Sequence, residues 1–154
     1  MDGGLGEVLE DLYEAEADLH LELERVSERH RADAEVAGGL RALSRWSERH
    51  VENLAAAGRR YGLALGGPMP SADRLDVVGH GSAQPVGLVG DLRQVFGDAS
   101  MVQLDWELLA EVARAQQNRE LLGLAEHSIV ETQRLLTWVE TRLKEMVVHA
   151  VALP

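Results

Sequence analysis

The chain has 154 residues, enough for one domain with a sizeable core, and it contains no cysteine, which excludes disulfides and thiolate chemistry. Its formal net charge is −11, from 26 acidic and 15 basic residues, so we expect no binding to nucleic acid. The sequence has no run near the roughly 18 apolar residues of a membrane span and no signal-peptide pattern at its start. We therefore expect a cytoplasmic protein that does not associate with membranes.

The first predicted helix covers residues 5–29. Glu16 interrupts its apolar stripe, and burying this carboxylate costs free energy unless a partner pairs with it. We therefore expect Ala15 to take the inward place and Glu16 to lie at the flank. The apolar residues recur with helical spacing: Leu5, Leu9, Leu12, Leu19, Leu23 and Val26.

The second predicted helix covers residues 33–61, with Asp33 as its N-cap. His50 is a polar exception on the inward stripe, and a lone inward histidine is more often a hydrogen-bonded core residue than a ligand. We expect Trp46 to pack beside it, and Gly38-Gly39 to permit close approach of another helix. The stripe consists of Val36, Leu40, Leu43, Ser47, His50, Leu54, Ala57 and Tyr61.

Residues 62–99 are rich in glycine and hold three of the four prolines, which predicts a long crossover. Within it only residues 91–96 are expected to form a helical turn, ended by Gly97. The glycine pairs in 79–82 and 87–90 lack the strand and the lysine of a phosphate-binding loop.

The third predicted helix covers residues 101–115 and begins with a capping box formed by Ser100 and Gln103. Its expected inward stripe is Met101, Leu104, Leu108, Val112 and Ala115.

The fourth predicted helix covers residues 118–148, with Asn118 as its N-cap. We expect Thr132 to face inward, and His127 and Glu131 to point away from the core. The inward stripe is Ala125, Ile129, Thr132, Leu136, Val139, Leu143 and Met146, and the apolar tail 147–154 is expected to pack on the bundle end or on a partner.

Two helical hairpins joined by a long crossover predict an all-α four-helix bundle that forms a single domain over residues 1–154. Residues 12–19 (LYEAEADL) and 46–54 (WSERHVENL) resemble the first two helices of small, uncharacterised bacterial proteins of the ferritin-like superfamily. Residues 105–109 (DWELL) and 138–145 (WVETRLKE) resemble the second half of such a protein. The resemblance implies a ferritin-like bundle.

Metal-binding members of that superfamily hold two iron or manganese ions between the helices. They use a Glu from each of two helices and a Glu-x-x-His pair from each of the other two. Carried over to this chain, Glu16 matches the Glu of the first helix and His50 matches the His of the second. Ser47, however, stands three residues before His50, and no histidine of the chain has a Glu at that spacing.

The resemblance therefore implies at most a metal half-site of Glu16 and His50, with His20 and Glu24 near its rim. Two interpretations of this pair stay open. The two side chains bind a divalent metal weakly, or they form a buried Glu–His pair that costs about as much free energy as it gains.

The expected function is that of a ferritin-like bundle with a degenerate metal site, acting as a non-catalytic binding or assembly protein. We expect no cofactor and a homo-oligomer, a dimer, with an unknown protein or small molecule as a further partner. The alternative is a di-iron or di-manganese carboxylate protein that acts on iron, peroxide or oxygen. It would require a carboxylate such as Glu111 or Glu131 to face inward.

Overall fold

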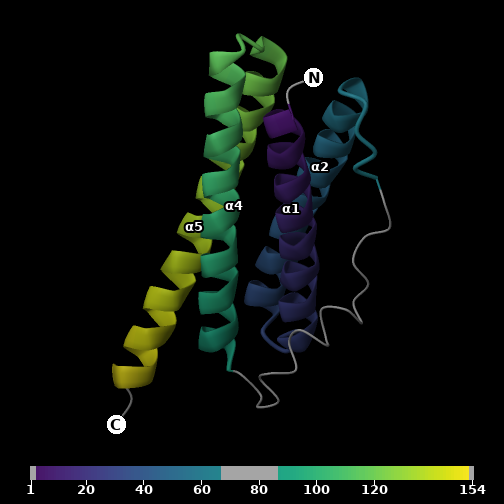
Figure 1. Ribbon diagram of the computed structural model, residues 1–154. Coiled ribbons are helices and arrows are strands. Elements are labelled where there is room, and N and C mark those ends of the chain that lie inside the picture. Colours follow the sequence, from purple (N-terminus) through teal and green to yellow (C-terminus); the bar gives the residue numbers. More distant parts are fainter. Residues whose placement is uncertain (1–2, 67–86, 153–154) are drawn as a thin grey trace.

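The computed structural model describes residues 3–66 and 87–152, and over these ranges the chain forms helices and no strand. The helices are α1 (Gly3–Arg29), α2 (Ala34–Arg60), α4 (Leu88–Ala115) and α5 (Arg119–Ala152). Figure 1 shows them side by side along most of their length, with the end of α5 leaning away from the others. The prediction of an all-α bundle is confirmed for the described residues.

The helices α1 and α2 form a hairpin whose facing sides carry the predicted stripes. Asp33 caps α2, because its Oδ1 accepts a hydrogen bond from the backbone N–H of Val36 at 3.2 Å. Every apolar stripe residue of α1 is buried, and so is every stripe residue of α2 except Tyr61, which is half-buried. These two helices therefore present the faces that their periodicity predicts.

The start of α4 differs from the prediction. Residues 91–96 are helical, as expected, but they belong to a helix that begins at Leu88, so the expected end at Gly97 and the expected start near Ser100 were wrong. Gly97 lies inside the helix, and the Ser100 hydroxyl donates to the Phe96 carbonyl at 2.8 Å instead of capping. The inward residues Val95 and Ala99 are fully buried, and this burial outweighs the roughly 1 kcal/mol by which Gly weakens a helix. The glycine pair in 79–82 lies outside the described residues.

The predicted inward face of α4 was also wrong. Met101, Leu104 and Leu108 are 58%, 44% and 49% exposed. The buried side of the helix is formed instead by Val95, Ala99, Val102, Trp106, Leu109, Ala110 and Ala113. Both sets recur every three or four residues, and α4 therefore carries two apolar faces.

Contacts at the helix ends fix the directions of the four helices. Arg29 and His30, at the end of α1, bind Asp91 near the start of α4. At the opposite end of the bundle, Asn118 beside the start of α5 donates to the hydroxyl of Tyr61, which follows α2. The helix α4 therefore runs antiparallel to α1 and parallel to α2, and α5 runs antiparallel to α4, as Figure 1 shows.

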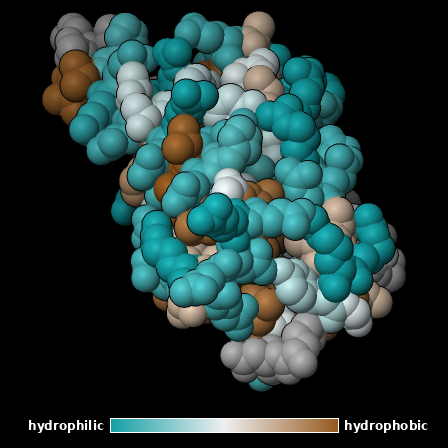
Figure 2. All heavy atoms as spheres, turned by 90° about the horizontal axis from the view of Figure 1, so that it is seen from above, coloured by the Kyte–Doolittle hydropathy of each residue, from teal (hydrophilic) through white to brown (hydrophobic). Residues whose placement is uncertain are grey.

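The fourth helix of the bundle, α5, begins after Asn118, whose Oδ1 accepts from the backbone N–H of Leu121 at 3.1 Å and confirms the predicted N-cap. An ion pair of 3.0 Å joins Arg142 to Glu35 in the first turn of α2. Helical residues continue beyond this ion pair to Ala152, and Figure 2 shows hydrophobic atoms in brown at this end of the molecule. No helix in the described ranges has the length and apolar character to cross a membrane.

Candidate functional site

A buried network of two carboxylates and one imidazole lies between the helices. His50 on α2 is 3% exposed, and its two ring nitrogens bind carboxylates from two other helices. Nδ1 lies 3.2 Å from Oε2 of Glu16 on α1, and Nε2 lies 2.9 Å from Oε1 of Glu131 on α5. One imidazole therefore links three helices.

Glu16 is fully buried, so the expectation that Ala15 takes the inward place was wrong. Its Oε2 accepts a second hydrogen bond, from the indole Nε1 of Trp106 on α4 at 2.7 Å. The partners His50 and Trp106 explain how the helix tolerates a carboxylate on its apolar stripe. The other oxygen, Oε1, has no hydrogen-bond partner.

Trp106 is the fourth member of the network and the largest fully buried side chain of the described residues. Its ring meets the imidazole of His50 edge to face, with 5.6 Å between centroids and 74° between planes. We expected Trp46 in this position, one turn before His50 on the same helix. The ring that contacts His50 comes from α4 instead, and it reaches both Glu16 on α1 and His50 on α2.

Glu131 is buried, so the expectation that it points away from the core was wrong. Its Oε2 accepts from Arg49 at 3.2 Å, and its Oε1 lies 3.4 Å from the exposed His127. Thr132, the next residue, is also buried, as predicted. Two consecutive residues face inward because α5 packs against both α4 and α2, which gives it a wider buried face than a narrow stripe.

The pKa shifts of His50 and Glu131 favour the charged forms of these two side chains. Burial alone would lower the pKa of His50, but its hydrogen bonds to Glu16 and Glu131 and their negative charges raise it. Burial alone would raise the pKa of Glu131, but the hydrogen bond and charge of His50, with His127 and Arg49 nearby, lower it. His50 is therefore favoured as an imidazolium that donates from both nitrogens.

His20, expected at the rim of the pair, lies on α1 one turn after Glu16 and makes separate contacts. Its Nδ1 is 2.9 Å from the backbone oxygen of Ser44, and its Nε2 is 3.5 Å from Glu24. The structure thus brings Glu16 and His50 together, as expected, and leaves His20 and Glu24 as a neighbouring pair.

The arrangement of the network differs from that of metal ligands. A metal-bound histidine offers a nitrogen lone pair to the ion, whereas both nitrogens of His50 face carboxylate oxygens. Over residues 3–66 and 87–152, no group of three or more His, Asp or Glu side chains is placed to hold a metal ion. What the arrangement can do is join α1, α2, α4 and α5 at one buried point.

A second set of titratable groups lies where α1 packs against α4. Burial, a hydrogen bond to Asp98 and the negative charge of Asp98 raise the pKa of Glu22 to about 9. The positive charge of Arg25 lowers this pKa, and the negative charge of Asp91 raises it further. Burial and the charge of Asp11 also raise the pKa of Asp105. The contact between α1 and α4 therefore places carboxyl groups opposite each other.

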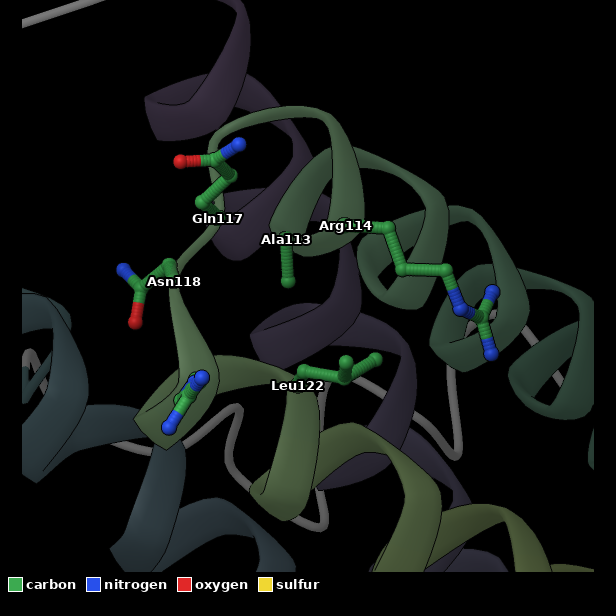
Figure 3. A pocket seen from close by; sticks show the side chains of 6 residues that line it. Ala113, Arg114, Gln117, Asn118 and Leu122 are labelled. Carbon is green, nitrogen blue, oxygen red and sulfur yellow. The ribbon is translucent and has the colours of Figure 1, made fainter.

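An open hollow of about 480 Å³ lies at the turn between α4 and α5 (Figure 3). It is lined by Ala113, Arg114, Gln117, Asn118, Arg119 and Leu122. Two of its polar side chains are engaged, since Arg114 pairs with Glu111 and Asn118 binds Tyr61 and the start of α5. None of the four network residues lines this hollow.

Comparisons with models of known protein families, with curated proteins and with solved structures gave no match to this chain.

Proposed function

We propose that this chain is a ferritin-like helical bundle with a degenerate metal site, and that it acts as a non-catalytic binding or assembly protein. The observation that carries the proposal is the pairing of His50 with both Glu16 and Glu131. Side chains that would bind ions in a metal-binding member of the superfamily here bind each other. Such a network contributes to a defined packing of the helices rather than to a reaction.

The residue pattern around the network supports the loss of ligands. Glu16, His50 and Glu131 have the residue types of metal ligands on three helices. Ser47 precedes His50 by three residues, and Arg134, which is exposed, follows Glu131 by three where a histidine would complete a pair. On α4 the side chain that reaches Glu16 belongs to Trp106, whose indole N–H cannot bind a metal. The residues present therefore do not fit a two-metal centre.

The alternative is a di-iron or di-manganese carboxylate protein that acts on iron, peroxide or oxygen. Two observations favour it. Glu131 faces inward, as this alternative requires. Oε1 of Glu16 is buried and has no hydrogen-bond partner, so it has a free acceptor position. To serve such a centre, His50 would have to release at least one carboxylate and turn a deprotonated nitrogen toward the ion.

Elemental analysis distinguishes the two functions. The purified chain, with and without anaerobic Fe(II) or Mn(II), is compared with Glu16→Gln, which keeps the size of the side chain and an acceptor for Trp106. We expect a metal content near zero in both proteins. A content of about two ions per chain that is lost in Glu16→Gln would favour the alternative. Far-UV circular dichroism of both proteins checks that they are folded.

A further inference from the structure

The outer face of α4 carries an unpartnered apolar stripe, which we call the outer stripe and which consists of Met101, Leu104 and Leu108. These residues are spaced by three and four positions and are 44–58% exposed. They lie on the side of α4 away from the buried Trp106. A helix that is apolar on two opposite sides is normally covered on both.

A second unpartnered apolar surface lies on residues 143–152 of α5, which we call the projecting end. Leu143 and Met146 on its other side still pack against the core, and the helix continues for six residues beyond Met146, about 9 Å at the rise of an α-helix. Val147, Val148 and Val151 share one side of it and are 48%, 68% and 80% exposed. Figure 1 shows this end leaning away from the other helices.

We propose that two copies of the chain form a closed dimer in which the projecting end of each copy packs on the outer stripe of the other. The proposal rests on the assembly role proposed above, and it identifies the partner in that assembly as a second copy of the chain. Each of the two contacts joins the projecting end of one copy to the outer stripe of the other. A single symmetric arrangement therefore covers both apolar surfaces of both copies.

Charge favours this pairing over the pairing of two outer stripes. Glu107 and Glu111 are exposed beside the stripe. Face-to-face packing of α4 on α4 would bring the carboxylates of two chains together, each with a net charge of −11. The projecting end carries one acidic and one basic residue, Glu145 and Lys144, which cancel. It is a neutral apolar segment that can approach an acidic rim without this repulsion.

The area that a dimer needs gives a second reason. Specific interfaces bury about 1,200–2,000 Å² in total, which three side chains on one helix do not supply. The reciprocal arrangement has two contacts, each with the three side chains of an outer stripe and the three valines of a projecting end. The valines are therefore needed as much as the stripe.

The test measures the mass of the full chain in solution by light scattering over a range of concentrations. A stripe variant combines Leu104→Gln and Leu108→Gln, and an end variant combines Val148→Thr and Val151→Thr. The control is Val130→Thr, which changes an exposed valine of α5 outside both surfaces. We expect a dimer for the wild type and the control, and at least tenfold weaker dimerisation for each double variant. All variants should keep the circular dichroism spectrum of the wild type.

Mixing the two double variants makes the test specific for the reciprocal contact. A mixed dimer keeps one intact contact, between the end of the stripe variant and the stripe of the end variant. Native mass spectrometry should therefore detect more mixed dimer than dimer of either variant. A monomeric wild type, or an end variant that dimerises as the wild type does, would overturn the proposal. Neither result bears on the metal content, so the proposed degenerate site is tested separately.

Discussion

The indole N–H of Trp106 donates to Oε2 of Glu16 at 2.7 Å across the contact between α1 and α4, where both side chains are fully buried. The bond joins the two hairpins of the bundle at its centre. It also favours the observed orientation of α4 over one with Met101, Leu104 and Leu108 inward, because the face that carries Trp106 brings a hydrogen-bond donor to the carboxylate.

Replacing Trp106 with Phe is expected to destabilise the fold. The ring still fills much of the site, but the buried Oε2 of Glu16 loses a donor, which typically costs about 1–3 kcal/mol. Urea unfolding followed by circular dichroism measures the change. Trp46→Phe, at a half-buried position of α2, is the matched control and should cost less. Equal losses in the two variants would contradict the role assigned to the hydrogen bond.

Replacing His50 with Leu should destabilise the protein by about 3–5 kcal/mol, the usual cost of leaving a buried charge without its partner. Adding Glu16→Leu should recover part of this loss, because it removes the carboxylate left uncompensated. The measurement is a double-mutant cycle, which compares the free energies of unfolding of the wild type, both single variants and the double variant. If the costs of the two single variants simply add, His50 and Glu16 are not coupled.

Gly39 provides a test of the packing of α2 against α5. A Cβ at this position would overlap the ring of Trp138, so we expect Gly39→Ala to cost about 1–3 kcal/mol. Gly38 is the matched control, because a Cβ there meets nothing within 4 Å. Gly38→Ala should be neutral or stabilise the helix by up to about 1 kcal/mol. Thermal unfolding measures the stability of both variants relative to the wild type. A Gly39→Ala protein as stable as the wild type would contradict this packing.

The carboxyl pair of Glu22 and Asp98 predicts a dependence of stability on pH. The pKa of Glu22 is raised from 4.5 to about 9, so between these values the native state holds a proton that the unfolded state has lost. The contribution of Glu22 to stability is therefore full below pH 4.5 and is lost as the pH rises toward 9.

This dependence is measured by urea unfolding of wild type and Glu22→Gln between pH 5 and 9. The variant should lose less stability than the wild type over the range, because its side chain does not ionise. Parallel curves for the two proteins would show that Glu22 titrates normally.

The periodicity of the sequence was sufficient for α1 and α2, because each has one apolar face. It was insufficient for α4, where Met101, Leu104 and Leu108 repeat with the same spacing as Val102, Trp106 and Leu109. The choice between the faces is made by tertiary contacts, among them the bond to Glu16. Gly97 was misinterpreted as a helix end for the same reason. The helix continues through Gly97 because residues on both sides of it are buried against other helices, and this burial exists only in the folded chain.

The site was predicted in part. Glu16 and His50 could be chosen because each is a polar residue on an apolar stripe. Glu131 could not, because it stands beside Thr132, which fits the stripe better, and a helix packed on two neighbours buries both. From the sequence it was named only as a carboxylate that a di-metal centre would require to face inward.

The nitrogen NMR signals of the His50 imidazole test directly whether both ring nitrogens donate to the carboxylates of Glu16 and Glu131. In the ¹⁵N-labelled chain at pH 6, we predict that Nδ1 and Nε2 are both protonated, and that one equivalent of Zn(II), a diamagnetic probe, leaves both signals unchanged. Loss of the proton from one nitrogen, with a shift to the position of a metal-bound imidazole, would contradict it. In that case the carboxylates around His50 would be ligands rather than its hydrogen-bond partners.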